Sequence, residues 1–178
     1  MKNVVLKKRV LVSLVSLSLL LGTKSAYAST YYTDEYGDTV KETVTYDSDG
    51  IESVEVEKEL QVVPLGAPFW VASSKVARTY EFNFTMTFNG TGSSKSYTSK
   101  SKSGYKSIDK VGVFTTLTMG STVLAQKSVS NQHASTAVAT ASKANVIGDG
   151  TLKDTSNHTF EHTGYQSWYP TTVAKSAW

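Results

Sequence analysis

The chain has 178 residues, with 18 basic and 15 acidic side chains, a formal net charge of +3 and no cysteine. The absence of cysteine excludes disulfide bonds, a thiol nucleophile and a lipid-modified cysteine. Neither a G-x-S-x-G elbow nor a glycine-rich phosphate loop occurs in the sequence. We therefore expect a protein that is not an enzyme and that uses no cofactor and no metal.

The first 28 residues have the three parts of a secretory signal peptide. A basic start leads into an apolar run over residues 10–22, and the segment ends in the Ala-x-Ala pair of Ala26 and Ala28. The apolar run is shorter than the roughly 20 residues that a transmembrane helix needs. We expect cleavage between Ala28 and Ser29 and a secreted protein of residues 29–178, released from the cell or loosely retained at its envelope. Such a leader suits a bacterial protein.

Removing the signal peptide reverses the sign of the net charge. Five basic residues are lost with it, and 13 remain against 15 acids, a net charge of −2. The lost residues are Lys2, Lys7, Lys8, Arg9 and Lys24. Because the apparent basicity belongs mostly to the leader, binding to nucleic acid is not expected.

The remaining charges are unevenly distributed along the chain. Residues 29–60 hold ten acids and two lysines, whereas residues 75–178 hold eleven bases and five acids. One interpretation is a single domain over residues 29–178 whose acidic and basic parts face solvent or each other. The other is an acidic prosegment, residues 29–74, that is cleaved from a cationic domain, residues 75–178.

Two pairs of alternating segments predict hairpins. VKETVTY and IESVEVEK flank DSDG, whose Asp and Gly residues suit a short connection. VGVFTTLTM and STVLAQKSV flank Gly120, which allows a tight reversal. Both hairpins require antiparallel pairing of neighbouring strands.

Two further segments show the same period of two. YEFNFTMTF predicts a half-buried strand that ends at a turn, NGTG, and HASTAVATAS alternates small and hydroxyl residues before a GDG turn at residues 148–150. No segment after the leader combines helical periodicity with helix caps. We therefore expect an all-β fold, either an antiparallel β-sandwich or a small β-barrel built from hairpins.

Residues 93–107 form a serine-rich segment that carries four lysines: Lys95, Lys100, Lys102 and Lys106. The segment has no aliphatic residue to bury, so one interpretation is a long mobile loop of a hairpin. The functional alternative is a cationic arm that contacts an anionic surface, such as wall polymer or lipid headgroups. Each lysine near such a surface contributes at most about 1 kcal/mol.

His158, Glu161 and His162 match the H-x-x-E-H signature of a zinc peptidase family. Two imidazoles four residues apart lie within roughly 6 Å along a helix but roughly 13 Å apart along a strand. The β-branched neighbours Thr159 and Thr163 favour a strand, so we expect no zinc site here. A single imidazole joining His133 in a metal site is the weaker alternative.

The aromatic residues Tyr165, Trp168 and Tyr169 lie beside Gly164 and Pro170, a composition typical of a turn. Their rings either cap the open end of the core, or are exposed and contact sugar faces, a membrane interface or a protein partner.

Two functions are compatible with these features. The first is a secreted, non-enzymatic β protein that binds a cell-envelope polymer or an extracellular partner through the aromatic turn and the four lysines. The second is a bacteriocin-like or β-pore-forming toxin that acts on membranes. Its support is that VGVFTTLTM and HASTAVATAS resemble, in composition, the insertable hairpins of β-pore-forming toxins.

Overall fold

A computed structural model describes residues 11–12, 26–34, 36–47, 51–60, 66–80, 86–146 and 150–176, although for residues 11, 12, 26, 27 and 80 it describes the backbone alone. Within these ranges the chain forms strands, turns and bends and no helix, which confirms the all-β prediction. The strands are β1 (Leu11–Val12), β2 (Ala26–Thr33), β3 (Thr39–Tyr46), β4 (Glu52–Glu59), β5 (Phe69–Tyr80), β6 (Met86–Tyr97), β7 (Ile108–Met119), β8 (Thr122–Ala134), β9 (Thr136–Ala144), β10 (Leu152–Glu161) and β11 (Thr171–Lys175).

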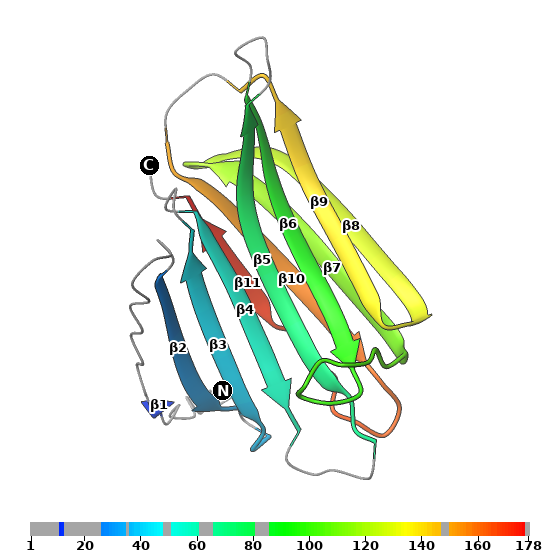
Figure 1. Ribbon diagram of the computed structural model, residues 1–178. Helices are drawn as coiled ribbons and strands as arrows, with labels where there is room; N and C mark the ends of the chain where they lie inside the picture. The colour runs from blue at the N-terminus through cyan, green and yellow to red at the C-terminus, as the bar shows by residue number, and fades with distance from the viewer. Residues whose placement is uncertain are drawn as a thin grey trace, which may run out of the picture.

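The strands form two antiparallel sheets that lie face to face (Figure 1). The larger sheet has the order β1-β2-β3-β4-β5-β6-β9, and the smaller has the order β11-β10-β7-β8. The smaller sheet packs over β4, β5, β6 and β9. The chain passes from the smaller to the larger sheet through Ser135, between β8 and β9. The described strands do not close into a barrel, so the sandwich is the architecture found.

Both predicted hairpins are present. Strands β3 and β4 pair with Val44 opposite Val54, and β7 pairs with β8 from Ile108 opposite Ala134 to Met119 opposite Thr122. Gly120 has a φ of 55° in the reversal between β7 and β8, the left-handed conformation that glycine adopts without strain.

The predicted NGTG turn is wrong. Strands β5 and β6 pair from Phe69 opposite Tyr97 to Tyr80 opposite Met86, and residues 89–92 lie inside β6. Gly90 and Gly92 face the smaller sheet, where an added Cβ would come within 3.2 Å of the side chains of Asp154 and Ser156. These glycines therefore allow the two sheets to approach closely, as a glycine inside a strand can do. Residues 81–85 of the predicted strand YEFNFTMTF lie outside the described residues.

HASTAVATAS is likewise not one strand. His133, with a φ of 48°, and Ala134 end β8, and Thr136 begins β9 in the other sheet. Most of the predicted GDG turn lies outside the described residues.

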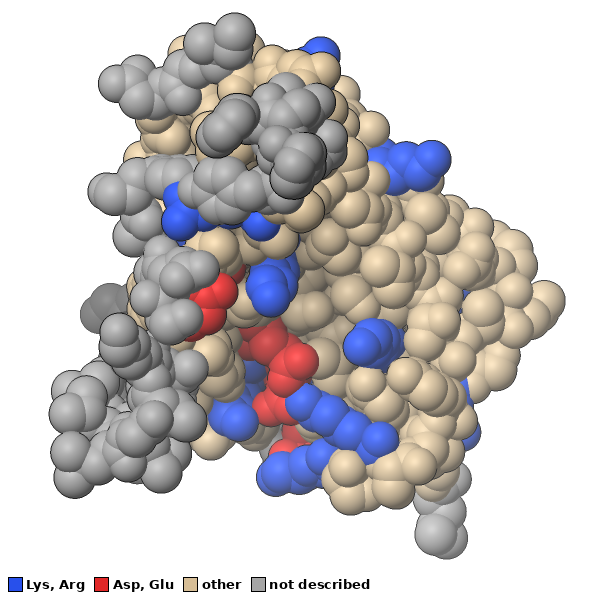
Figure 2. All heavy atoms as spheres, turned by 45° about the horizontal axis from the view of Figure 1, so that its top comes forward, with Lys and Arg blue, Asp and Glu red and all other residues tan. Residues whose placement is uncertain are grey.

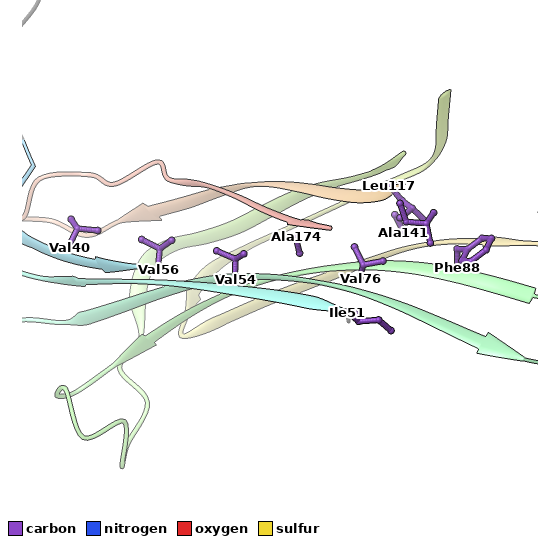
Figure 3. Packing of buried hydrophobic residues seen from close by; sticks show 10 residues of the cluster. Val40, Ile51, Val54, Val56, Val76, Phe88, Leu117, Ala141 and Ala174 are labelled. Atoms are coloured by element: carbon purple, nitrogen blue, oxygen red, sulfur yellow. The ribbon is translucent and has the colours of Figure 1, made fainter. Parts of the chain in front are cut away.

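Two apolar clusters occupy opposite ends of the sandwich. One contains Val54, Val76, Phe88 and Leu117, and Figure 3 shows side chains of this cluster between the ribbons of the two sheets. The other is built around Trp70, with Val111, Val113 and Phe160 among its members. Burial of each large apolar side chain stabilises the fold by about 1.5–3 kcal/mol relative to its exposure.

Two glycines and a group of polar side chains lie between the two clusters on the inner side. We call this set the polar seam: Gly90, Gly92 and Ser94 of β6, Thr115 of β7, Asp154, Ser156 and His158 of β10, and Thr172 of β11. Its polar groups are buried and hydrogen-bonded to one another. Asp154 accepts hydrogen bonds from the hydroxyls of Thr115 and Ser156.

The predicted processing sites fall within strands. Ala28 and Ser29 lie in β2 opposite Val44 and Thr43, while most of the predicted signal peptide lies outside the described residues. The alternative boundary before Lys75 falls inside β5, whose residue Trp70 is fully buried. Cleavage there divides a strand that pairs with both β4 and β6.

Candidate functional site

Strand β4 presents a row of carboxylates on the outer face of the larger sheet. Its inward side chains include Val54 and Val56, so the period of two places Glu55, Glu57 and Glu59 on the opposite face. The sequence ESVEVEKE thus forms a strand with an acidic outer side, while its inner side carries the two valines and the buried Lys58.

The loop between β6 and β7, residues 98–107, has a defined conformation. The Tyr105 ring stacks on Tyr97 with a centroid separation of 5.1 Å, and the Thr98 amide donates to the Gly104 carbonyl at 2.8 Å. A tight turn follows, in which the Lys102 amide donates to the Ser99 carbonyl at 3.1 Å and Lys102 has a φ of 55°. These contacts fold the loop back over the end of β6.

Ion pairs join this loop to the acidic row. The Lys102 ammonium lies 2.7 Å from Glu55 and 2.5 Å from Glu57, and Lys100 lies 3.1 Å from Glu59. Lys41 of β3 lies 3.4 Å from the other oxygen of Glu57. Figure 2 shows acidic side chains gathered in one strip with lysine side chains against them. The acidic and cationic parts of the chain therefore face each other here.

The charges in this cluster perturb the titration of its members. Partial burial alone raises the pKa of Glu57, but the hydrogen bond and charge of Lys102, together with Lys41, outweigh it and lower that pKa. Partial burial alone lowers the pKa of Lys102, and the hydrogen bonds to Glu55 and Glu57 outweigh it and raise that pKa. Both groups are thus held in their charged forms at neutral pH.

A pocket of about 340 Å³ lies between the loop and the outer face of the sheet. It is lined by Tyr31, Thr39, Lys41, Glu57, Glu59, Phe69, Lys100 and Lys102. Phe69 belongs to a small buried cluster with Val71 and Tyr97 on this outer face, whereas Tyr31 is 42% exposed. The outer-face pocket therefore combines an apolar surface with ammonium and carboxylate groups, and its volume is within the range of small-molecule sites.

The structure separates the four predicted lysines. Lys100 and Lys102 line the outer-face pocket, Lys95 lies on the outer face of β6 opposite Val71, and Lys106 follows in the loop. The prediction of one long mobile loop over residues 93–107 is wrong, because residues 93–97 belong to β6. Three serines of this part of β6 are buried, Ser93, Ser94 and Ser96, and among them Ser94 donates to the Gly112 carbonyl at 2.7 Å.

The three aromatic residues of the predicted turn, Tyr165, Trp168 and Tyr169, differ in burial. The Trp168 ring packs against Phe160 at a tilt, with 5.2 Å between ring centroids, and stacks on Trp70 at 6.4 Å, so it extends the core. Tyr165 is half-buried and stacks on His162, with 5.4 Å between ring centroids. Tyr169 is 61% exposed, and its hydroxyl donates to Glu161 at 3.0 Å. The three rings therefore cap the core in part and present Tyr169 to solvent.

Asp109 connects the aromatic turn to the start of β7. Its carboxylate accepts hydrogen bonds from the Thr163 amide at 2.7 Å and the Thr163 hydroxyl at 2.6 Å, and it lies 3.3 Å from His162 Nδ1. The hydrogen bonds from Thr163, with a smaller contribution from His162, lower the pKa of Asp109. The two loops at this end of the sandwich, visible in Figure 1, are thus tied together at their bases.

The H-x-x-E-H segment is strand up to Glu161, where β10 ends, so the predicted strand is confirmed for all of it but His162. His158 lies in β10 in the polar seam, and His162 follows the strand with its side chain against Asp109. Ser94 donates to Gly112, so its oxygen accepts from His158 Nδ1, and Nε2 accepts from the Thr172 hydroxyl at 2.8 Å. Burial lowers the pKa of His158 to about 3. Among the described residues, no three metal-ligating side chains lie close enough to hold an ion.

Sequence reasoning missed most of the outer-face pocket. Tyr31, Lys41 and Phe69 come from three different strands, and no local pattern connects them. The available signal was the alternation of Glu55 and Glu57, which by itself indicates only a solvated face. Lys58 was also missed: it is fully buried, 2.6 Å from Asp34 and 2.8 Å from Asp38.

Comparison with protein families, with curated proteins and with solved structures finds no match to this chain. Within the described ranges, no helical segment has the length and hydrophobicity needed to cross a membrane.

Proposed function

We propose that this chain is a secreted, non-enzymatic β protein that binds a cell-envelope polymer or an extracellular partner through the outer-face pocket. The observation that carries the proposal is the combination of surfaces in one pocket. Tyr31, which is 42% exposed, and the largely buried Phe69 line it, together with charged residues from β3, β4 and the β6–β7 loop.

This combination suits a hydroxyl-rich chain. Aromatic rings contact the carbon faces of sugars and polyols, and charged side chains hydrogen-bond to their oxygens. The groups are already oriented, because Lys102 is held by two carboxylates and the loop by the Tyr97–Tyr105 stack. Binding then requires little ordering of side chains, which lowers its entropic cost.

The aromatic turn supplies a second contact in this proposal. Tyr169 is its exposed ring, while Trp168 and Tyr165 hold the turn against Phe160 and His162. Because Asp109 ties the turn to the start of β7, the Tyr169 side chain is fixed relative to the sheet that carries it.

Co-sedimentation of the secreted protein with purified cell wall tests the proposal. We expect saturable binding that falls when Tyr31 is replaced by alanine and is unchanged by Tyr36→Ala, a matched control because Tyr36 is similarly exposed, at 56%, outside the pocket lining. Equal loss of binding in both variants, or no binding to walls or to extracellular protein, would contradict the proposal.

The second candidate is a bacteriocin-like or β-pore-forming toxin. Exposed apolar side chains on β7, β8 and β9 favour it: Phe114 is 39%, Val123 55% and Val138 50% exposed. Lys127 opposes it: it lies opposite Thr115, on the face of the β7–β8 hairpin that carries Val113 and Leu117, so a hairpin that turned this apolar face to lipid would also place the lysine in lipid. A lysine at the bilayer midplane costs about 2–4 kcal/mol in a β-barrel. Dye leakage from liposomes at micromolar protein supports the toxin; wall binding without leakage supports the first function.

A further inference from the structure

We infer that the outer-face pocket selects a polyol chain that carries phosphodiester groups, with Lys41 and Lys100 as its phosphate contacts. The inference rests on the proposed function and names the class of ligand for the same pocket.

The hydrogen-bonding groups that remain at the pocket are mainly donors. An ammonium group has three N–H donors. In the described structure, Lys41 and Lys100 each form one ion pair, at 3.4 Å and 3.1 Å, and their side chains are 35% and 74% exposed. Each of them therefore keeps donors for a ligand.

The acceptors, in contrast, are largely occupied. Both carboxylate oxygens of Glu57 are engaged, one by Lys102 and the other by Lys41, and its side chain is only 13% exposed. Glu59, whose side chain is 48% exposed, shares one oxygen with Lys100, and its other oxygen is a spare acceptor. A pocket with spare N–H donors and few spare acceptors favours a ligand rich in acceptor oxygens.

The formal charge of the lining also favours an anionic ligand. Three lysines and two glutamates line the pocket, a net charge of +1. Lysine binds phosphate as a point charge, and arginine, whose fork matches both carboxylate and phosphate, is absent from this lining. The lining therefore suits an anion whose several oxygens meet separate ammonium groups, as those of a phosphate do.

The aromatic residues of the pocket would contact the polyol part of the ligand. Phe69 and Tyr31 give the pocket an apolar surface beside the ammonium groups, and the carbon chain between two phosphates fits against such rings. Lys102 positions the loop: it is held at 2.7 Å and 2.5 Å by Glu55 and Glu57, which keeps Lys100 at the pocket.

The test measures binding to wall before and after hydrofluoric acid removes its phosphodiester-linked polymer, with soluble poly(glycerol phosphate) as competitor. We expect at least about tenfold weaker binding to stripped wall, competition by the soluble chain, and weakening as salt rises from 0.15 to 0.5 M. Lys41→Gln and Lys100→Gln should each weaken binding about fivefold, the effect of about 1 kcal/mol per lysine. Lys127→Gln, the same charge change on the exposed strand β8 of the smaller sheet, should change it less than about twofold.

The thermal unfolding midpoint of each variant must match that of the parent chain. We expect this match because the substituted lysines lie at the surface. Equal binding to intact and stripped wall, or equal effects of Lys100→Gln and Lys127→Gln, would overturn the phosphodiester class while leaving the proposed function intact. Binding to neither wall nor extracellular protein would defeat the proposed function itself. Vesicles of phosphatidylglycerol form a separate arm: tight binding there, lost in Lys100→Gln, supports the same chemistry with a lipid headgroup as its source.

Discussion

The inner side of the sandwich and the outer face of the larger sheet use the same kinds of residue for different ends. On the inner side, His158, Asp154 and Lys58 are buried, and each is satisfied by specific partners. On the outer face, Lys41 and Lys100 are partly solvated and keep spare donors.

The difference shows that burial decides what a polar residue does. Removing the partner of a buried charge lowers the stability of the fold by several kcal/mol, whereas an exposed ion pair contributes at most about 1 kcal/mol to that stability. The inner groups are therefore committed to the fold, and the outer ones are available to a ligand. Five substitutions or conditions test this division.

Removing the Lys58 side chain should have the largest effect. Lys58→Ala leaves the carboxylates of Asp34 and Asp38 without their buried partner, and breaking such a cluster costs about 3–5 kcal/mol. Urea denaturation followed by tryptophan fluorescence measures the loss. Lys58→Met, which keeps the apolar stem, should lose less. A loss of stability below about 1 kcal/mol for the alanine variant would show that Lys58 behaves like the partly solvated lysines of the outer face.

Acid should destabilise the fold through His158. Its pKa in the folded chain is about 3 and the unfolded value is 6.5, so the unfolded chain binds the proton first as the pH falls. The stabilising contribution is complete above pH 6.5 and is progressively lost as the pH falls from 6.5 to 3. Denaturation midpoints measured across this range give the slope, and His158→Asn should flatten it.

The pH dependence of stability that Asp154 contributes is opposite to that of His158. Burial raises its pKa despite the hydrogen bonds from Thr115 and Ser156, so its stabilising contribution is present at low pH and is lost as the pH rises through the folded pKa. Asp154→Asn removes this term and leaves that of His158. An acid slope that persists unchanged in His158→Asn contradicts the assignment.

A methyl group at Gly92 should cost about 2 kcal/mol. The added Cβ would lie 2.6 Å from a methyl group of Val113 and would also collide with Ser156, so the sheets must separate locally. Gly112→Ala is the matched control, since its nearest atom would be 3.4 Å away. Similar unfolding midpoints for the two variants would show that the sheets are not in close contact at the polar seam.

Lys102→Gln should have the smallest effect on stability, below about 1 kcal/mol, because its ion pairs are partly solvated. The local effect should be larger: amide hydrogen exchange of residues 98–107 should accelerate, since the loop loses both carboxylate contacts. Exchange unchanged in that loop would mean that the Tyr97–Tyr105 stack holds it alone.

Local patterns predicted the parts of the fold that local chemistry determines. The β3–β4 and β7–β8 hairpins followed from alternation and from turn residues such as Gly120, and the β-branched residues around His158 indicated a strand. The NGTG error has a non-local cause. A glycine that admits Asp154 or Ser156 from the opposite sheet has the same local sequence as a glycine in a turn.

The outer-face pocket could not be predicted for the same reason. The positions of Tyr31, Lys41 and Phe69 on a common face depend on the pairing of β2, β3, β4 and β5. Opposite charge in residues 29–60 and residues 93–107 was visible in the sequence, but not which carboxylate each lysine meets. The aromatic turn was predicted as a group, and the structure showed that Trp168 belongs to the core.

The most direct test of the binding site is an NMR titration of the ¹⁵N-labelled secreted protein with poly(glycerol phosphate). The outer-face pocket predicts saturable shift changes in the amides of Tyr31, Lys41, Glu57, Phe69 and Lys100, reduced in Lys100→Gln. Shift changes confined to residues 165–169 or to the β7–β8 hairpin, with the pocket amides unmoved, would contradict the account.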